Sequence, residues 1–261
     1  MLNVVRMSYL ITDLMFAGST DVGVQRSVNQ DSYYVSPQGD LFIVADGMGG
    51  HVGGKEASRL STDVIREFIA ARQDSDCASD ELLKKAVFAA NEAVLADQRQ
   101  HPDRAEMGTT VVIVMVRNGQ FWCAHVGDSR LYLLRESGFM QLTQDHTWVA
   151  QAMVAGELSA EQLATHPWRH VLSQCVGRED LKTVDTQMLK TEPGDRLLLC
   201  SDGLSEELSS DAIITYLQSA QTCEEAVSTL ISAANVRGGR DNITAIALAI
   251  PEFPTVVPGC A

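Results

Sequence analysis

The chain has 261 residues, of which 45% are hydrophobic and 21% are charged, as is usual for a globular protein with a sizeable buried core. Its formal net charge of −14 gives an acidic surface that repels nucleic acid and anionic membranes, so we expect neither as a partner. The six cysteines show no C-x-x-C spacing, which favours buried reduced thiols in the cytoplasm over a metal finger.

The first 14 residues are moderately apolar but are interrupted by Arg6 and Asp13. No uninterrupted apolar run is therefore long enough to span a bilayer, and the segment lacks the basic start and cleavage site of a signal peptide. We predict an N-terminal arm over residues 1–14, one domain over 15–250, and a proline-containing tail over 251–261.

Short apolar runs bounded by turn residues predict strands over 41–45, 107–116, 120–126, 130–135, 139–143, 184–189, 195–200 and 242–250. The 107–116 run does not alternate, so we expect both of its faces to be covered. Asn118-Gly119 is a strong hairpin signal, and residues 107–143 as a whole predict an antiparallel meander. This order argues against a doubly wound parallel sheet, in which helices alternate with strands.

Helices are predicted in blocks, because apolar residues there recur every three or four positions. The predicted ranges are 54–72, 80–100, 209–219 and 222–235. Ser79 is the expected N-cap of the second helix. The pattern predicts an α+β fold in which helix pairs pack on antiparallel sheets.

Aspartates recur beside glycine where apolar strands end. Asp46, Asp128 and Asp202 occupy such positions, Asp241 directly precedes the last strand, and Asp31 precedes a short apolar run. Any one of them could belong to an ordinary turn, since Asp-Gly is a favoured turn dipeptide. Five together, with few basic residues nearby, indicate a hard cation such as Mg²⁺, Mn²⁺ or Ca²⁺ held by oxygen ligands from distant segments.

Seven short motifs occur in order: VQRSVNQDSYYV (24–35), VADGMGGHVGG (44–54), MGTT (107–110), VGDSRLY (126–132), LTQDH (142–146), LLCSDGL (198–204) and GGRDNIT (238–244). Together they resemble the bacterial form of the PP2C (PPM) family of metal-dependent protein serine/threonine phosphatases, from about residue 16 to residue 249. The resemblance implies a four-layer α-β-β-α sandwich with two central, mostly antiparallel sheets flanked by helix pairs. It also implies a flap inserted at about residues 145–180.

The resemblance assigns a metal-binding role to each matching carboxylate. Asp46 is expected to bridge two Mn²⁺ or Mg²⁺ ions, and Asp202 and Asp241 to complete the protein ligands of the first ion. The carbonyl of Gly47 and the carboxylate of Asp31 are expected to serve the second ion.

Two further residues gain a role from the same resemblance. Asp128, together with Asp202, is expected to hold a third and weaker ion, as in bacterial members of the family. Arg26 is expected to grip the substrate phosphate through a two-pronged contact. Without the motif, an arginine of this kind would more often belong to a surface salt bridge.

The implied reaction is hydrolysis of phosphoserine and phosphothreonine by a hydroxide bridging two Mn²⁺ or Mg²⁺ ions. The expected partners are phosphorylated proteins, either substrates of a eukaryotic-like bacterial Ser/Thr kinase or regulators of a sigma factor or secretion system. We expect a cytoplasmic monomer. Two other readings stay open: an inactive relative that binds phosphoproteins, and a different metal-assisted hydrolase such as a nuclease.

The sequence departs from the family pattern at two positions. Gln30 stands where many members have a glutamate, and Met48 where eukaryotic members have a histidine proposed as the general acid. His51 is an alternative proton donor, although a structural histidine is the more common case. In the flap, Trp148 and Trp168 are either contact anchors for a protein substrate or local core.

Overall fold

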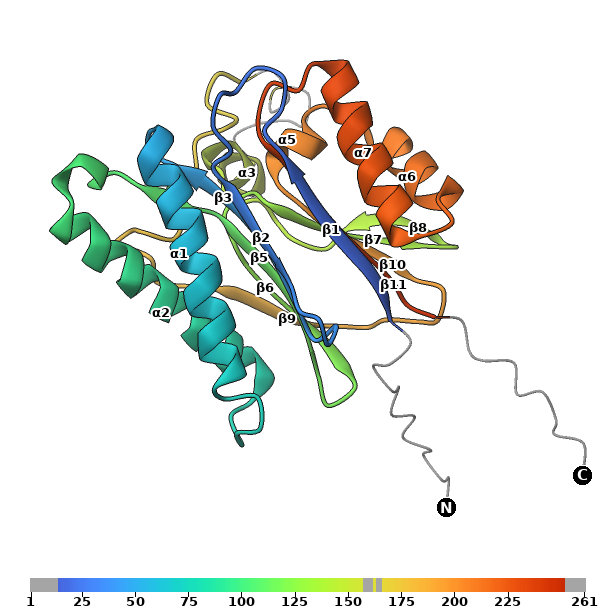
Figure 1. Cartoon of the computed structure of the whole chain (residues 1–261), viewed down its shortest axis with the longest axis horizontal. Helices are drawn as coiled ribbons and strands as arrows, with labels where there is room; N and C mark the ends of the chain where they lie inside the picture. Colours follow the sequence, from blue (N-terminus) through green and yellow to red (C-terminus); the bar gives the residue numbers. More distant parts are fainter. Residues whose placement is uncertain (1–13, 157–161, 163–165, 252–261) are drawn as a thin grey trace, which may run out of the picture.

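The computed structural model describes residues 14–156, 162 and 166–251, and it shows the predicted α+β fold. Two antiparallel sheets lie face to face, and a pair of helices covers the outer face of each (Figure 1). The predicted four-layer sandwich is therefore confirmed. The predicted N-terminal arm and C-terminal tail lie almost entirely outside the described residues.

The first sheet has five strands in the order β1-β11-β10-β7-β8. These strands are β1 (Met15–Asp21), β7 (Arg130–Arg135), β8 (Gly138–Gln141), β10 (Arg196–Cys200) and β11 (Ile243–Ala249). Helices α6 (Ser210–Ser219) and α7 (Cys223–Arg237) pack on its outer face, and the short α5 (Asp202–Ser205) follows β10 directly.

The second sheet runs in the order β2-β3-β5-β6-β9. Its strands are β2 (Asp31–Val35), β3 (Leu41–Met48), β5 (Val111–Arg117), β6 (Gln120–Val126) and β9 (Asp185–Leu189), and β4 (Gly108–Thr109) pairs with the end of β3. Helices α1 (His51–Ala70) and α2 (Ser79–Gln100) cover its outer face. A one-turn helix (Pro102–Arg104) follows α2, and α3 (Trp148–Val154) lies in the predicted flap.

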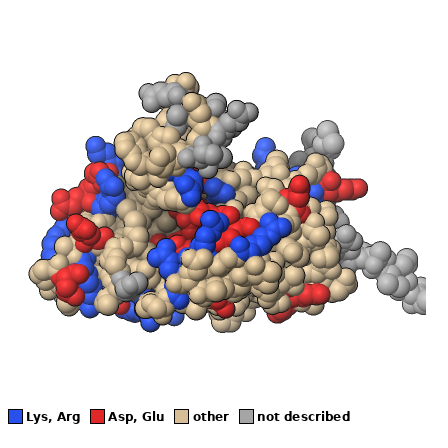
Figure 2. Space-filling view, turned by 90° about the horizontal axis from the view of Figure 1, so that it is seen from above, with Lys and Arg blue, Asp and Glu red and all other residues tan. Residues whose placement is uncertain are grey.

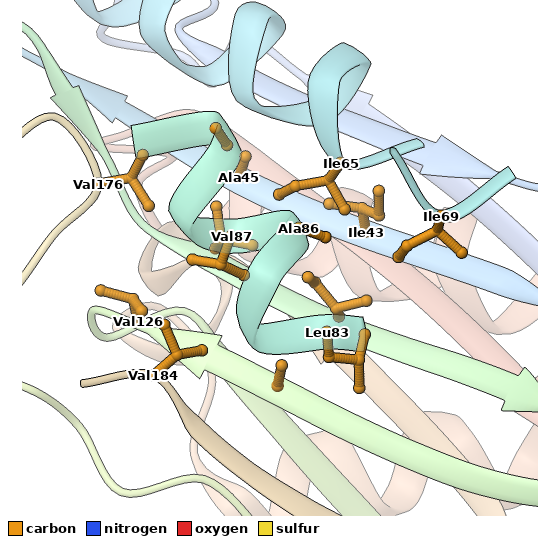
Figure 3. Close-up of a cluster of buried hydrophobic side chains, with 14 of the residues drawn as sticks. Ile43, Ala45, Ile65, Ile69, Leu83, Ala86, Val87, Val126, Val176 and Val184 are labelled. Carbon is orange, nitrogen blue, oxygen red and sulfur yellow. The ribbon is translucent and has the colours of Figure 1, made fainter. Parts of the chain in front are cut away.

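Side-chain alternation along the central strands produces these layers, because successive residues of a strand point to opposite faces. In β3, Ile43 and Ala45 pack against α1 and α2, where Figure 3 shows them near Ile65 and Leu83. The alternate residues Phe42 and Val44 face the other sheet, in the core between the two sheets. Both faces of β3 and β5 are buried, as the non-alternating sequence of β5 predicts.

The predicted meander is split between the two sheets. Strands β5 and β6 form a hairpin in one sheet, with Asn118 and Gly119 at φ 55° and 71° as expected for its turn, while β7 and β8 pair in the other sheet. The chain therefore crosses between sheets at residues 127–129. The predicted strand 107–116 is also broken, since β4 pairs with β3 and β5 begins only at Val111.

The predicted N-cap at Ser79 is wrong. Ser79 is the first residue of α2, and Ala78 occupies the cap position without a side-chain hydrogen bond. The Ser79 hydroxyl instead accepts a hydrogen bond from Arg117 Nη1, at 3.4 Å, which also donates to the carbonyl of Cys77. The hydroxyl that the local sequence pattern assigned to helix capping is thus bonded to an arginine far away in sequence.

The buried thiols agree with the prediction. Cys123, Cys175 and Cys200 are buried and free of disulfide bonds. Burial raises the pKa of Cys123 and Cys200 to about 12, which keeps both thiols protonated and unreactive. Separately, no helix in the described part of the chain has the length and apolar character needed to cross a membrane.

Candidate functional site

A cavity of about 360 Å³ opens at one end of the two sheets. Figure 2 shows Asp and Glu side chains inside a hollow on this face, bordered by Lys and Arg. Six of the seven predicted site residues line the cavity: Arg26, Asp46, Gly47, Asp128, Asp202 and Asp241. Segments that are far apart in the chain therefore converge here, as the sequence predicted.

Asp31 and Asp46 are directly opposite each other across β2 and β3. Like charges in such a position repel and destabilise a sheet. The backbone of Asp46 is nevertheless held firmly, because its carbonyl accepts hydrogen bonds from Thr109 Oγ1 and Thr110 N, and its N–H donates to Thr110 Oγ1. The fold thus maintains a pairing of carboxylates that is unfavourable unless a cation offsets it.

Gly47 follows Asp46 at a point where the chain leaves no room for a side chain. A Cβ atom there would lie 2.0 Å from the carbonyl oxygen of Gly54 and 2.6 Å from that of Gln30. Glycine lets the end of β3 lie directly against the start of α1. Because Gly47 also lines the cavity, its backbone can approach a bound ion closely.

The remaining three aspartates lie at joints between elements. Asp202 begins α5 two residues after the end of β10, and Asp241 lies two residues before the start of β11, which pairs with β10. Asp202 and Asp241 therefore lie at the same end of the first sheet. Asp128 lies in the crossing between the sheets, so the split of the predicted meander is what brings it to the cavity.

Burial and mutual repulsion raise the pKa values of four of these carboxyls. Burial raises the pKa of Asp31 to about 7, opposed by hydrogen bonds and reinforced by Asp202 and Asp241. Burial, with Glu206 and Asp241 adding to it, raises the pKa of Asp202 to about 6. The pKa values of Asp46 and Asp128 also lie well above the usual range, mainly through burial.

In EDTA-treated protein, we expect the melting temperature to fall by several degrees as the pH rises from about 5 to about 8. Asp31 and Asp202 have folded-state pKa values of about 7 and about 6, above the usual 3.8, so the folded state holds extra protons in this window. Stability is lost as those protons leave. Calorimetry over a pH series measures the slope, and a melting temperature that stays level or rises would contradict the prediction.

Arg26 lies at the rim of the cavity and pairs with one of the predicted metal ligands. Its Nη2 is 2.7 Å from Asp241 Oδ2, its Nε donates to the carbonyl of Arg240, and 45% of its side chain is exposed. Arg26 therefore forms a surface salt bridge, as is common for an arginine, and it also lies at the predicted site. The guanidinium offsets part of the acidic charge when no ion is bound.

The loop that carries Arg26 is tied to the segment before β11. Asn242 Oδ1 accepts a hydrogen bond from Gln30 N, and Asn242 Nδ2 donates to the carbonyls of Val22 and Val28. Three hydrogen bonds of a buried amide thus shape one loop, and both of its N–H groups are used. This loop carries Arg26 on one side and leads into Asp31 on the other.

The structure accounts for one of the two departures from the family pattern. Gln30 Nε2 donates a hydrogen bond to the carbonyl of Gly50, at 2.8 Å, whereas a glutamate would set a carboxylate against that carbonyl. Met48 lines the cavity and provides no proton donor. The side chain of His51, the alternative donor, lies outside the described part of the structure.

The described part of the predicted flap, about residues 145–180 and called the flap below, carries an exposed aromatic group. Trp148 and Trp168 are 36% and 55% exposed, and their rings pack edge to face at 5.1 Å, with His166 against both. Of the two interpretations of Trp148 and Trp168, local core does not fit these exposed fractions. Helix α3 confirms the predicted early helix, while residues 157–161 and 163–165 lie outside the described residues.

Sequence reasoning missed several residues of the site. His170 lines the cavity from the flap, and its Nδ1 is 2.7 Å from Glu206 Oε1. No motif singled it out. Thr110, Ser201 and Thr244 lie inside the quoted motifs. A hydroxyl residue within a motif gives no sequence signal of its own.

A second group of possible ligands lies at the base of the flap, where atoms of His125, His146 and Asp185 approach within 4.8 Å of one another. The N–H of Gly127 donates to His146 Nδ1, which places the proton of the neutral ring on Nε2. That nitrogen faces Asp185 Oδ2 at 3.4 Å. A protonated nitrogen does not bind a metal ion, so His146 instead pairs with Asp185. His125 stacks on the His146 ring at 4.6 Å and hydrogen-bonds to the carbonyl of Gln144.

Known proteins share both this sequence and this fold. A family model described as Protein phosphatase 2C matches residues 23–239. The serine/threonine protein phosphatase PstP of Mycobacterium tuberculosis is 35% identical over 243 residues, covering 92% of this chain but only 46% of PstP, so the chain spans about half the length of that relative. The serine/threonine phosphatase Stp of Listeria monocytogenes is 36% identical over 234 residues, covering 87% of this chain and 92% of Stp.

A solved structure resembles the fold over almost its whole length. The catalytic domain of PstP, in complex with two manganese ions, aligns with a TM-score of 0.78 at 33% identity. The alignment covers 92% of this chain and 99% of that structure.

Proposed function

Because the chain belongs to the protein phosphatase 2C family, we propose that it hydrolyses phosphoserine and phosphothreonine in other proteins with the help of two Mn²⁺ or Mg²⁺ ions. One observation carries the proposal. Asp46, Asp202 and Asp241, from three distant segments, line one cavity, and Asp31 is directly opposite Asp46. The two manganese ions in the PstP structure support the same assignment.

The residues present fit a pair of hard cations. All the predicted side-chain donors are carboxylate oxygens, the donor type that such ions prefer. Asp31 Oδ1 is buried and has no hydrogen-bond partner among the described residues, which is costly for a carboxylate unless a cation meets it. Burial, with nearby carboxylates adding to it, raises the pKa values of Asp31 and Asp46, so their ionised forms are costly unless a cation neutralises them.

We assign the first ion to Asp46, Asp202 and Asp241, and the second to Asp46, the Gly47 carbonyl and Asp31. Asp128 with Asp202 would hold a third, weaker ion. When bound, the pair of ions supplies an acidified water molecule as nucleophile and positive charge for the phosphoryl oxygens.

The protein itself contributes phosphate binding and positioning. Arg26, freed from Asp241, presents two parallel N–H groups to phosphoryl oxygens from the rim of the cavity. Thr109 and Thr110 keep Asp46 in place from behind. The exposed Trp148 and Trp168 of the flap are proposed contacts for the protein around the phosphorylated residue.

The partner of such an enzyme is a phosphorylated protein. We propose a catalytic unit spanning residues 15–250, with the flap at about 145–180, that acts as a monomer in the cytoplasm and opposes a bacterial Ser/Thr kinase. The buried free thiols suit a reducing compartment. An inactive phosphoprotein-binding relative is disfavoured by the complete aspartate set, and a nuclease by the net charge of −14.

An assay on purified protein tests the proposal. We expect Mn²⁺-dependent release of phosphate from p-nitrophenyl phosphate and from a phosphothreonine peptide, abolished by EDTA and restored by adding Mn²⁺ back. Mn²⁺ binding without turnover would favour the inactive relative. Faster cleavage of DNA than of the phosphopeptide would favour the nuclease.

A further inference from the structure

The two oxygens of Asp31 have very different surroundings. Oδ2 accepts hydrogen bonds from Ser201 Oγ at 2.8 Å and from Thr244 Oγ1 at 2.6 Å. Oδ1 has no partner among the described residues, although Asp31 as a whole is only 7% exposed. One oxygen is thus saturated by the protein, and the other is kept free.

The donors and acceptors behind Oδ2 can be assigned without ambiguity. With Asp31 ionised, the form that binds a cation, its oxygens can only accept, so the single hydroxyl proton of Thr244 points to Asp31. Thr20 Oγ1, which is 2.7 Å from Thr244 Oγ1, must then donate to it, and Thr20 in turn accepts from Asn29 Nδ2 at 2.8 Å. Asn29 Oδ1 accepts from the backbone N–H of Asp31, which closes the ring of hydrogen bonds.

Ser201 also donates its hydroxyl proton to Asp31. It occupies the N-cap position of α5, yet its side chain makes no capping hydrogen bond. Its Oγ accepts from the N–H of Thr244, at 3.0 Å, and its proton goes to Asp31 Oδ2. A residue placed where a cap is normally useful therefore serves a carboxylate in the other sheet.

The contact also joins the two halves of the fold. Asp31 belongs to β2 of the second sheet, whereas Thr20 and Thr244 belong to β1 and β11 of the first sheet, and Ser201 follows β10. The hydroxyls therefore set the position of Asp31 relative to Asp202 and Asp241, which come from the first sheet. A metal site built from both sheets requires hydrogen bonds that fix the ligands of one sheet relative to those of the other.

We propose that Ser201 and Thr244 form a hydroxyl clamp, a pair of positioning residues that occupies Asp31 Oδ2 and reserves Oδ1 for the second cation. This inference rests on the proposed metal-dependent function. Partners that orient a metal ligand by hydrogen bonding typically change metal affinity when they are replaced, and the clamp predicts such a change at two positions that no ligand assignment includes.

Isothermal titration of the EDTA-stripped protein with Mn²⁺ tests the clamp. We expect Thr244→Val to weaken the binding of at least one ion by roughly 10- to 100-fold, because it removes the hydroxyl without changing side-chain shape. Thr244→Ser keeps the hydroxyl and is expected to bind Mn²⁺ almost as the wild type does. Ser201→Ala, which shortens a different residue, is expected to weaken binding in the same direction.

Thr62→Val is the matched control. Thr62 lies in α1, is also buried, and its Oγ1 has no hydrogen-bond partner among the described residues, so the same substitution is expected to leave Mn²⁺ affinity unchanged. Unchanged affinity in Thr244→Val and Ser201→Ala would overturn the clamp, and so would an equal loss in Thr244→Val and Thr244→Ser. A wild type that binds no Mn²⁺ would instead overturn the metal-dependent function itself.

Discussion

Asp46→Asn is expected to lower Mn²⁺-dependent hydrolysis of p-nitrophenyl phosphate by at least about 10³-fold, and at the same time to stabilise the metal-free protein. Activity falls because Asp46 is the proposed shared ligand of both ions, which together supply several kcal/mol of transition-state stabilisation. Stability rises because Asp46 is paired directly with Asp31 across the sheet, with Asp202 and Asp128 also nearby. Removing one of two facing charges should gain about 1 kcal/mol or more in EDTA.

The two effects have opposite signs, which makes the experiment informative. Phosphate release measures the first, and denaturant unfolding in EDTA measures the second. Asp63→Asn is the control, since Asp63 is a partly exposed residue of α1 whose ion pair with Arg59 is far from the site and worth little. If Asp46→Asn lost activity but destabilised the metal-free protein as well, the loss would reflect damage to the fold rather than removal of a metal ligand.

The sequence-based predictions that agree with the structure come from patterns within short segments of the chain. Asp46, Asp202 and Asp241 lie in short motifs next to buried strands, where a carboxylate is costly without a cation, so local sequence already carries the signal. Gly47 was assigned from the same motif, and the structure adds that a Cβ atom there would collide with Gly54. Strand and helix periodicity predicted helix pairs on antiparallel sheets, and the family resemblance implied the four layers, in which both faces of the central strands are buried.

The features that sequence reasoning missed depend on long-range contacts. The apolar runs of β6 and β7 read alike whether they share a sheet or cross between sheets, so the crossing that carries Asp128 was not foreseen. Ser79 matched the local pattern of an N-cap, but Arg117 takes its hydroxyl. His170 lines the cavity and contacts Glu206, which is far from it in sequence, and a lone histidine in a polar segment has no local signature.

The clamp shows why local patterns and tertiary roles diverge within the site. Ser201 and Asp202 are neighbours in the chain, yet the first contacts Asp31 in the opposite sheet and the second begins a helix. Thr244 follows Asp241 by three residues and serves the same carboxylate. Hydroxyl residues within a few positions of one ligand in a motif are thus candidates for orienting another ligand that lies far away in sequence.

Arg26→Ala is expected to lower kcat/KM for a phosphothreonine peptide by roughly 10²- to 10³-fold, the usual cost of losing one donor to a charged transition state. Inorganic phosphate should also become a weaker inhibitor of the variant. Arg26→Lys should recover only part of the loss, because an ammonium group cannot make the two-pronged contact of a guanidinium.

Mn²⁺ titration separates phosphate binding from an indirect effect on the metal site. Arg26 Nη2 donates to Asp241 Oδ2 at 2.7 Å, so it would compete with a cation for that oxygen. Arg26→Ala should therefore bind Mn²⁺ at least as tightly as the wild type does, while Arg59→Ala, on the surface of α1, should change neither property. A parallel loss of Mn²⁺ affinity and kcat/KM in Arg26→Ala would show that Arg26 organises the metal ligands instead of binding the substrate phosphate.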